Sequence, residues 1–388
     1  MSARRLRLAQ RRKTVGFSQE RLAEVVGVDR STVVRWERAE TDPQPWHRPR
    51  LAAALNVSVE ELARLLADFG DAPGQPNERL DYVLRHPSRV DLVAVAYLRE
   101  HVQRLDARYE HTPSALLLAE TGQVYGQAVF LRQHAPTGPV RRELMAGIAE
   151  SAILMGQLVW DASHRRDYAA SNVYFDEAVS AARNARDVVT KAHAVLRKSY
   201  VALYGTRNPA AGLALASRAA STSADASQVI TGLARLHAGE ASAMLGDTNG
   251  CTSALGTAAE HLASIGADDP AALLFCPSQY GRLAGSCQLH LGRPDKAQAI
   301  LEASRQLLPV GRKANAIVMG NLALASIRQG HIDAGAARLH EAIDVIELTR
   351  AGGGLNVVFT AARELRPWRN EPMVQEVNDR LLTLMTAV

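Results

Sequence analysis

The chain has 388 residues, of which 47% are hydrophobic and 22% are charged. This length exceeds one ordinary hydrophobic core and leaves room for two or three domains. No stretch approaches the roughly 18 consecutive apolar residues that a transmembrane helix needs, so we expect no membrane span. The basic N-terminal segment is not followed by an apolar run, which argues against a secretion signal, and we expect a cytoplasmic protein.

The positive charge is concentrated near the N-terminus. Residues 1–70 hold 13 Lys and Arg against 9 Asp and Glu, whereas the remaining 318 residues hold 32 against 31. Residues 1–13 alone contain six basic residues and no acidic one. Because a localised positive field attracts phosphate, this segment is either a solvated basic tail or part of a nucleic-acid-binding domain.

Three short helices are predicted near the N-terminus. The basic pattern of residues 3–13 predicts the first, Ser18 can cap a second, and Asp29 can cap a third. Gly27 stands where the second helix must end in a left-handed turn, which glycine adopts without steric cost. Ala23 is small enough to let the third helix cross close to the second, so the helices can share one small core.

The third predicted helix has two different faces. With Val33 and Trp36 turned toward the core, the opposite face carries Arg30, Ser31, Thr32 and Arg35. Such side chains can reach base edges and phosphates. Trp36 and Glu37 are interpreted as structural residues, the first as a core anchor and the second as a local hydrogen-bonding or salt-bridge partner.

The segment SQERLAEVVGVDRSTVVRWERAETDP resembles the helix-turn-helix of the xenobiotic-response-element family, to which phage Cro and repressor proteins belong. The resemblance covers about residues 3–67 and implies a five-helix DNA-binding domain. It implies that Gln19 touches phosphate or braces the recognition helix, and that four residues of that helix enter the major groove, namely Arg30, Ser31, Thr32 and Arg35.

Two further arginines and a last helix complete the predicted domain. Arg48 and Arg50 follow a proline-rich segment and either contact the DNA backbone beside the groove or only cover surface. The last short helix is predicted at 59–66. Residues 70–79 are rich in Gly, Pro and polar groups and predict a linker between a DNA-binding domain at 1–69 and a second domain at 80–388.

The second domain is predicted to be helical and to repeat itself. A turn residue is followed four residues later by a small residue, eight later by an apolar one and eleven later by another small one. The matching sets, which start 41, 39, 46 and 38 residues apart, are Asp167-Ser171-Phe175-Ala178, Asn208-Gly212-Ala216-Ala219, Asp247-Cys251-Leu255-Ala258, Arg293-Ala297-Leu301-Ser304 and His331-Gly335-Leu339-Ala342. This spacing suits paired antiparallel helices and resembles tetratricopeptide repeats lengthened to about 40 residues.

The predicted fold class is therefore all-α, with a five-helix helix-turn-helix domain followed by a tetratricopeptide-like alpha-solenoid. Counting back about three, seven and eleven residues from the turn residues nominates side chains on the concave wall of the solenoid. As a set they describe a groove for a peptide or an acidic small molecule, although any one of them can equally be a solvated or packing residue. They are Trp160, His164, Arg197, Tyr204, Glu240, Arg282, Ser286, His290 and Arg328.

Motifs typical of enzymes and of metal sites do not occur in the sequence. The twelve histidines lack ligand spacing, and the three cysteines form no C-x-x-C pair. We therefore expect no enzymatic activity, no cofactor, no metal and no disulfide. The glycine run at 352–354 is interpreted as a flexible turn rather than a phosphate cradle, because no strand precedes it.

The joint pattern is similar to peptide-pheromone regulators of Gram-positive bacteria and to actinobacterial regulators. It implies a homodimeric transcriptional repressor that reads a palindromic operator on double-stranded DNA and binds a peptide or small-molecule effector in its repeat domain. Two alternatives remain open. One is a protein-interaction adaptor whose repeats bind a partner protein and whose head tethers it to DNA, and the other is a phage-type or antitoxin-like repressor without a small ligand.

Overall fold

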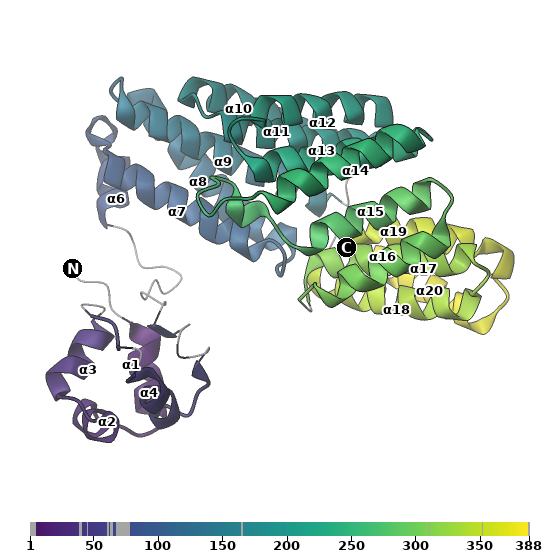
Figure 1. Cartoon of the computed structure of the whole chain (residues 1–388). Helices are drawn as coiled ribbons and strands as arrows, with labels where there is room; N and C mark the ends of the chain where they lie inside the picture. Colours follow the sequence, from purple (N-terminus) through teal and green to yellow (C-terminus); the bar gives the residue numbers. More distant parts are fainter. Residues whose placement is uncertain are drawn as a thin grey trace. The chain divides into compact units, whose positions relative to one another are not determined.

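The computed structural model describes residues 5–38, 41–44, 46–59, 62, 65–66, 78–163, 166–309, 311–350 and 352–386. Over these residues the secondary structure is helical, and no strand occurs among them (Figure 1). The chain divides into two compact units, Met1–Glu78 and Arg79–Val388. The first is a small helical unit and the second a helical repeat, so the predicted all-α class is confirmed.

The N-terminal unit is built from short helices around one small core. Its described helices are α1 (Leu6–Thr14), α2 (Gln19–Val26), α3 (Arg30–Glu37) and α4 (Arg48–Ala54). Each contributes buried apolar side chains to a core that includes Leu8, Leu22, Val26, Val33, Trp36 and Leu51. The last helix predicted here, at 59–66, lies largely outside the described residues, although Leu62 and Leu66 belong to the same core.

The second unit consists of a succession of helices. They are α6 (Glu78–Arg85), which begins at the boundary, α7 (Leu92–Arg108), α8 (Ser114–His134), α9 (Pro139–Ala162), α10 (Tyr168–Ala185), α11 (Val188–Tyr200), α12 (Pro209–Ser223), α13 (Gln228–Met244), α14 (Thr248–Ala263), α15 (Ser278–His290), α16 (Pro294–Gln306), α17 (Lys313–Arg328), α18 (Ile332–Thr349), α19 (Gly352–Glu364) and α20 (Pro372–Thr386). Short 3₁₀ turns lie at η1 (Pro87–Arg89), η3 (Ala272–Leu274) and η4 (Arg366–Trp368), and a π-helical turn, η2 (Val201–Gly205), extends α11. Each helix packs mainly on its neighbours in the sequence, as a repeat architecture requires.

The register of the repeat follows the predicted turn residues. Each of the five turn residues immediately precedes a helix, in chain order α10, α12, α14, α16 and α18. Asp167, Asn208 and Asp247 accept a hydrogen bond from the backbone N–H three residues on, which satisfies one of the free amides of the first helical turn. The small and apolar residues that follow each turn are buried. The predicted pairing of helices is confirmed, whereas the likeness to tetratricopeptide repeats stays a prediction.

Small residues are needed where the second helix of a pair crosses the first. A Cβ atom added to Gly335 in α18 would lie 2.6 Å from Cγ1 of Ile327 in α17. A Cβ added to Gly156 in α9 would lie 2.7 Å from the ring of Phe175 in α10. Because heavy atoms cannot approach so closely, these glycines set the distance between the paired helices.

The glycine run at 352–354 forms the first turn of α19, so its interpretation as a flexible turn is wrong. A Cβ on Gly352 would lie 2.8 Å from the carbonyl oxygen of Asp161, at the end of α9. Gly352 therefore allows α19 to approach α9, which lies almost 200 residues earlier in the chain. Within the described part of the chain, no helix is both long and apolar enough to cross a membrane.

Candidate DNA-reading helix and candidate ligand cavity

The cap and the turn glycine of α2 form as the sequence predicts, whereas the expected cap of α3 does not, because the Asp29 side chain accepts no capping hydrogen bond. The hydroxyl of Ser18 accepts a hydrogen bond from the backbone N–H of Arg21 at 3.0 Å, which caps α2. Gly27 ends α2 with a left-handed backbone, φ +82°, and its N–H donates to the carbonyl oxygen of Ala23 at 2.8 Å. Val33 and Trp36 are buried, so the angular position of α3 about its own axis is fixed by the core.

The opposite face of α3 is polar and accessible. Arg30, Ser31 and Arg35 are exposed, and Thr32 is half-buried. Arg35 donates a hydrogen bond to the Thr32 hydroxyl at 3.3 Å, and Arg30 forms an exposed ion pair with Glu20 at 2.5 Å. Exposed ion pairs contribute little to stability, about 0–1 kcal/mol, so both guanidinium groups can exchange these contacts for others.

Gln19 braces α3 from inside the unit. Its amide nitrogen donates to Glu37 Oε2 at 2.7 Å, and Arg12 Nε donates to Glu37 Oε1 at 2.6 Å. Arg12 and Glu37 are both buried, and Arg12 also donates to the carbonyl oxygen of Phe17. Of the two roles that the resemblance implies for Gln19, the arrangement supplies the bracing one. The structural role expected for Glu37 is present as a salt bridge.

Arg5, Arg11 and Arg12, which the sequence shows only as positive charge, have partners within the unit. Arg5 is 2% exposed and donates to the carbonyl oxygens of Leu66, Trp36 and Thr41, with an ion pair to Asp42. Such buried arginines tie separate segments of a small unit together. Their charge is therefore committed to the fold before any external partner is considered.

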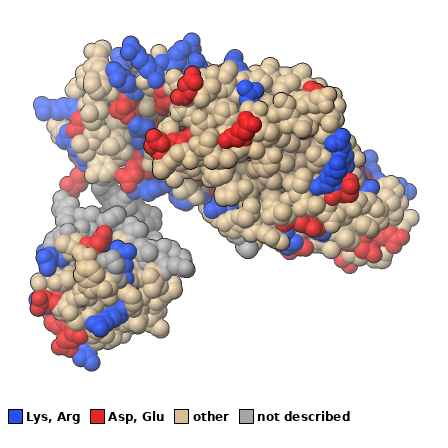
Figure 2. Space-filling view, viewed as in Figure 1, with Lys and Arg blue, Asp and Glu red and all other residues tan. Residues whose placement is uncertain are grey.

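Arg48 and Arg50 lie in the first turn of α4. Arg48 donates to the carbonyl oxygen of Pro43 at 3.1 Å, which stabilises the preceding turn. Arg50 is exposed, and its guanidinium lies 3.7 Å from the position that a Cβ on Gly27 would take. Arg50 is thus a neighbour of the α2–α3 turn. In Figure 2, Lys and Arg side chains on the visible face of the N-terminal unit are interspersed with Asp and Glu.

A cavity of about 900 Å³ lies within the repeat unit. Its wall is formed by the first helices of the pairs, α9, α11, α13, α15 and α17, together with α19 and the end of α7. None of its lining residues belongs to the second helices α10, α12, α14, α16 or α18. The long connection between α14 and α15, which accounts for the interval of 46 residues in the repeat, also contributes to the wall. The volume of the cavity falls in the range of small-molecule pockets, about 300–1,000 Å³.

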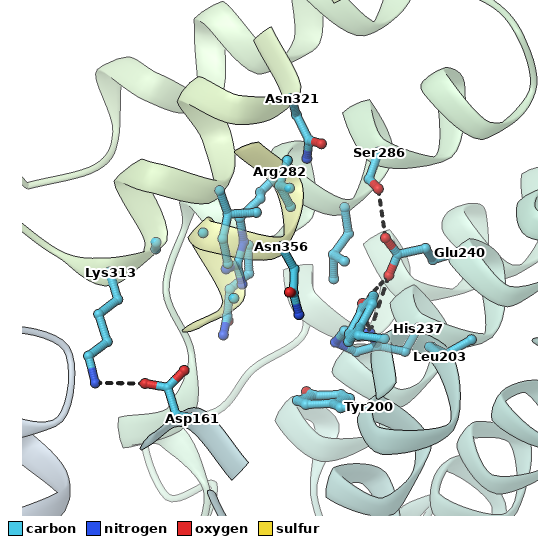
Figure 3. A pocket seen from close by; sticks show the side chains of 18 of the residues that line it. Asp161, Tyr200, Leu203, His237, Glu240, Arg282, Ser286, Lys313, Asn321 and Asn356 are labelled. Atoms are coloured by element: carbon cyan, nitrogen blue, oxygen red, sulfur yellow. Dashed lines mark hydrogen bonds and ion pairs between the residues drawn. The ribbon is translucent and has the colours of Figure 1, made fainter. Parts of the chain in front are cut away.

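One side of the cavity is closed by Lys313, the first residue of α17 (Figure 3). Its ammonium group donates to Asp161 Oδ2 at 3.0 Å and to the Ser114 hydroxyl at 2.6 Å, and it lies 3.9 Å from the ring centre of Tyr109. The backbone N–H of Lys313 donates to the carbonyl oxygen of Glu110 at 2.9 Å. We call this set of contacts the Lys313 closure. It joins the α7–α8 turn to α17 across about 200 residues of chain.

The other side holds a buried carboxylate, Glu240 of α13, which is 3% exposed. Glu240 accepts hydrogen bonds from the hydroxyls of Tyr204 and Ser286. The ring nitrogen Nδ1 of His237 lies 3.0 Å from the Tyr204 hydroxyl. The Tyr200 ring lies against His237, with the ring centres 4.1 Å apart. These residues form the Glu240 cluster.

The protonation states in the Glu240 cluster follow from burial. Burial lowers the pKa of His237, so we assign a neutral imidazole whose Nδ1–H donates to Tyr204. Burial and the neighbouring carboxylate raise the pKa of Tyr204 well above its usual value. Burial also raises the pKa of Glu240, but the hydrogen bonds that its carboxylate accepts, including that from the Ser286 hydroxyl, outweigh this and lower it below its usual value. The cluster therefore holds a carboxylate whose acceptor positions are occupied by neutral donors.

Seven of the nine predicted groove residues line this one cavity. They are Arg197, Tyr204, Glu240, Arg282, Ser286, His290 and Arg328. Trp160 does not; it is 4% exposed and packs against Phe175 and Val201 in the core, because the end of α9 turns this side chain toward α10 and η2. His164 lies outside the described residues.

The sequence did not predict the cavity-lining residues that lie outside the positions nominated by their distance from a turn residue. The α7–α8 turn contributes Tyr109 and Glu110, and α17 and α19 contribute Lys313, Asn321 and Asn356. Asn321 lies ten residues before the turn residue of α18, which is not one of the offsets used to nominate groove residues. No turn residue was assigned for α19, so Asn356 could not be nominated. Lys313 and Asp161 are 152 residues apart, and no sequence pattern links them.

The three cysteines are free thiols. Cys251 and Cys287 are buried free thiols, and Cys276 is half-buried. Within the described residues, no group of three or more His, Cys, Asp and Glu side chains is arranged to hold a metal ion.

Comparison with known proteins identifies the N-terminal domain. Residues 8–62 match the family model described as Helix-turn-helix. This part of the chain is therefore a helix-turn-helix domain of the type that the sequence resembles. No curated protein matches the chain.

Two solved structures of regulators share a low similarity with the chain. The crystal structure of Bacillus thuringiensis PlcR in complex with the peptide PapR7 and DNA has a TM-score of 0.32 and 11% identity, covering 79% of this chain and 94% of PlcR. The apo form of the competence regulator ComR from Streptococcus vestibularis has a TM-score of 0.25 and 12% identity, covering 60% of this chain and 96% of ComR. At these values neither likeness assigns a fold or a function to this chain.

Proposed function

We propose that this chain is a sequence-specific DNA-binding transcriptional regulator in which α3 enters the major groove. The observation that carries the proposal is the division of α3 into two faces. Val33 and Trp36 anchor one face in the core, and the other presents Arg30, Ser31, Thr32 and Arg35. A helix held in this way can offer a fixed pattern of donors and acceptors to base edges. The match to a helix-turn-helix family model supports the same role.

We further propose that the regulator acts as a homodimeric repressor on a palindromic operator. A single module of this size buries too little surface for high specificity, whereas two modules on half-sites about one helical turn apart supply it. In this proposal the repeat unit holds an effector in its cavity, and the effector shifts the population between dimers that bind the operator and dimers that do not. The cavity of about 900 Å³ supports that part of the proposal.

The test begins by selecting genomic fragments that the full chain binds, followed by titration of the best fragment and of a scrambled duplex of equal composition. The expected result is a clear preference for the selected fragment, with a strong decrease in affinity as salt increases. Arg35→Ala should raise the Kd roughly 5- to 150-fold, because one bidentate base contact contributes about 1–3 kcal/mol of discrimination.

The matched control is Arg305→Ala. Arg305 is an exposed arginine of α16 that pairs with Glu341, and its loss removes the same charge from the chain. This variant should leave the Kd unchanged. Equal affinity for selected and scrambled duplexes would instead favour the adaptor alternative, in which the head only tethers the chain to DNA. An unchanged Kd for Arg35→Ala would remove α3 from sequence reading.

A further inference from the structure

The wall of the cavity carries an excess of positive charge. Eight of its lining residues are lysine or arginine, and four are aspartate or glutamate. Two of the cations are neutralised directly, because Lys313 pairs with Asp161 and Arg328 pairs with Glu364. The other six have no carboxylate within ion-pair distance among the residues that the structure describes. The empty space is therefore an electropositive one.

Arg282 of α15 is the cation best placed to meet a ligand. Among the described residues its half-buried side chain has no hydrogen bond and no ion pair. Arg282 lines the same cavity as Tyr200, Tyr204 and His237, and its positive charge acts to lower the pKa of each of these three groups. In Figure 3, Arg282 and Asn356 lie between the Glu240 cluster and the Lys313–Asp161 pair.

Polar atoms without partners surround the same space. Gln157 is 6% exposed, and its buried Oε1 has no hydrogen-bond partner; the same holds for Nε of Arg312. Asn321 is 7% exposed, and in the described part of the chain its amide makes no hydrogen bond. Nearly all buried polar groups in folded proteins are hydrogen-bonded. Several such groups on one cavity wall are available to pair with a bound molecule.

The geometry favours one class of anion. The fork of a guanidinium group matches the two oxygens of a planar carboxylate, and Arg282 is a single fork. A doubly charged phosphate would place a second negative charge close to Glu240, which is already ionised and has no free donor to offer. Tyr200, Tyr204 and Leu203 add apolar surface beside Arg282, so the remainder of the ligand can be largely apolar.

We propose that the cavity binds an organic carboxylate, with the Arg282 guanidinium paired to the carboxylate and the amides of Asn321 and Asn356 bonded to polar groups on the rest of the molecule. This inference deepens the ligand control proposed above and rests on it for its biological role. The carboxylate belongs either to the free C-terminus of a short peptide or to a small organic acid. Both sources present the same planar anion to Arg282.

Two probe sets separate the sources, and both are tested on the full chain by native mass spectrometry and calorimetry. The first is a library of N-acetylated randomised hexapeptides with a free carboxyl terminus, paired with the same library as C-terminal amides. The second is a panel of aliphatic and aromatic monocarboxylic acids, paired with their primary amides. In at least one set the acid form should bind about tenfold or more tightly than its amide, because only the acid forms a charge-assisted pair.

The variants locate the effect. Arg282→Gln should remove the preference for the acid form, Arg282→Lys should retain part of it, and Arg305→Gln should leave it intact. Circular dichroism and thermal melting check that each variant is folded. If Arg282→Gln does not fold, Arg282→Lys still provides the test. The set that contains the binder identifies the source of the carboxylate.

Several results would overturn the inference. They are equal binding of acids and amides, an unchanged preference in Arg282→Gln, no binding from either set, or binding of phosphate monoesters in place of carboxylates. Operator binding without any added ligand is measured on the same preparations. If operator binding is intact while carboxylates fail, only this inference is lost; if operator binding fails while carboxylates bind, the proposed function is lost instead.

Discussion

The two units use buried charge in different ways. In the N-terminal unit, Arg5 and Arg12 are buried and their donors are taken up by backbone carbonyl oxygens, Asp42 and Glu37. In the repeat unit, apolar side chains and serine and threonine hydroxyls fill the space between helices, and the buried charged residues Asp161, Glu240 and Lys313 all line the cavity. A small unit with little apolar surface uses buried charges within its only core, whereas the larger unit confines its buried charges to the wall of one cavity.

The largest effect should come from breaking the Lys313 closure. Lys313→Met leaves Asp161 buried without its cation, and the loss of one partner of a buried pair costs about 3–5 kcal/mol. Denaturant unfolding of the full chain, followed through the repeat unit, measures the change in free energy. The double variant Lys313→Met with Asp161→Leu should recover part of the loss, because it removes both charges.

The control for that prediction is the exposed pair between Arg305 and Glu341. Arg305→Met should change the free energy of unfolding by less than about 1 kcal/mol. If Lys313→Met had no larger effect than Arg305→Met, the closure would be a surface contact rather than a structural element of the cavity.

Arg12→Met should come next, with a loss of about 3 kcal/mol confined to the N-terminal unit. We expect the lower end of the range for buried pairs because Gln19 still donates to Glu37 after the change. Hydrogen exchange resolves the two units: amides of α1 and α3 should lose protection while those of α13 and α17 keep it. An equal loss of amide protection in both units would show that the units do not unfold independently.

A steric prediction tests the helix pairs of the repeat unit. Gly335→Ala places a Cβ against Ile327 and should cost about 1–3 kcal/mol through overpacking. Gly256→Ala in α14 is the matched control, since nothing lies within 4 Å of its added Cβ. That control should stabilise the chain by about 0.5–1 kcal/mol, because alanine is the better helix former. Similar melting temperatures for the two variants would contradict the close crossing of α17 and α18.

The smallest effect concerns pH. Burial lowers the pKa of His193 well below its usual value, and the Arg197 charge adds to this. His193 Nε2 accepts a hydrogen bond from Arg197 Nε at 3.1 Å, which only the neutral ring can do. The unfolded chain therefore takes up a proton near pH 6.5 that the folded chain does not, so stability is complete above that pH and declines as pH falls below it.

His193→Gln should reduce this decline between pH 7 and pH 5, as measured by thermal melting at a series of pH values. His331→Gln, which changes an exposed histidine, is the control and should keep the wild-type slope. An identical slope in His193→Gln and the wild type would show that folding does not lower the pKa of His193.

Local patterns predicted much of the fold. The N-cap and turn glycine of α2 and the five turn residues of the repeat each depend on side chains within about one helical turn, so the sequence shows them directly. The same offsets predicted that residues such as Glu240 and Arg282 share a wall. The likeness to tetratricopeptide repeats and the role of the α3 residues in DNA reading stay predictions.

Contacts between distant segments could not be predicted in this way. The pairing of Lys313 with Asp161 depends on how the successive pairs bend the array, and a small change in each crossing angle would move these residues apart. Trp160 shows that the same method can fail for a local position. Trp160 and Glu240 both lie seven residues before a turn residue, but Trp160 packs in the core with side chains of α10 and η2. The burial of Arg5 and Arg12 could not be predicted either, because the partners Leu66 and Glu37 lie 61 and 25 residues away.

The Lys313 closure has a consequence for how the repeat unit folds. In an open array each pair contacts only its neighbours, so unfolding can start at an end and proceed pair by pair. A buried contact between the α7–α8 turn and α17 links early and late pairs in one cooperative element. We therefore expect the pairs from α9 to α16 to unfold in a single transition, and the array to fold more slowly than its local contacts alone would allow, because a loop of about 200 residues must close first.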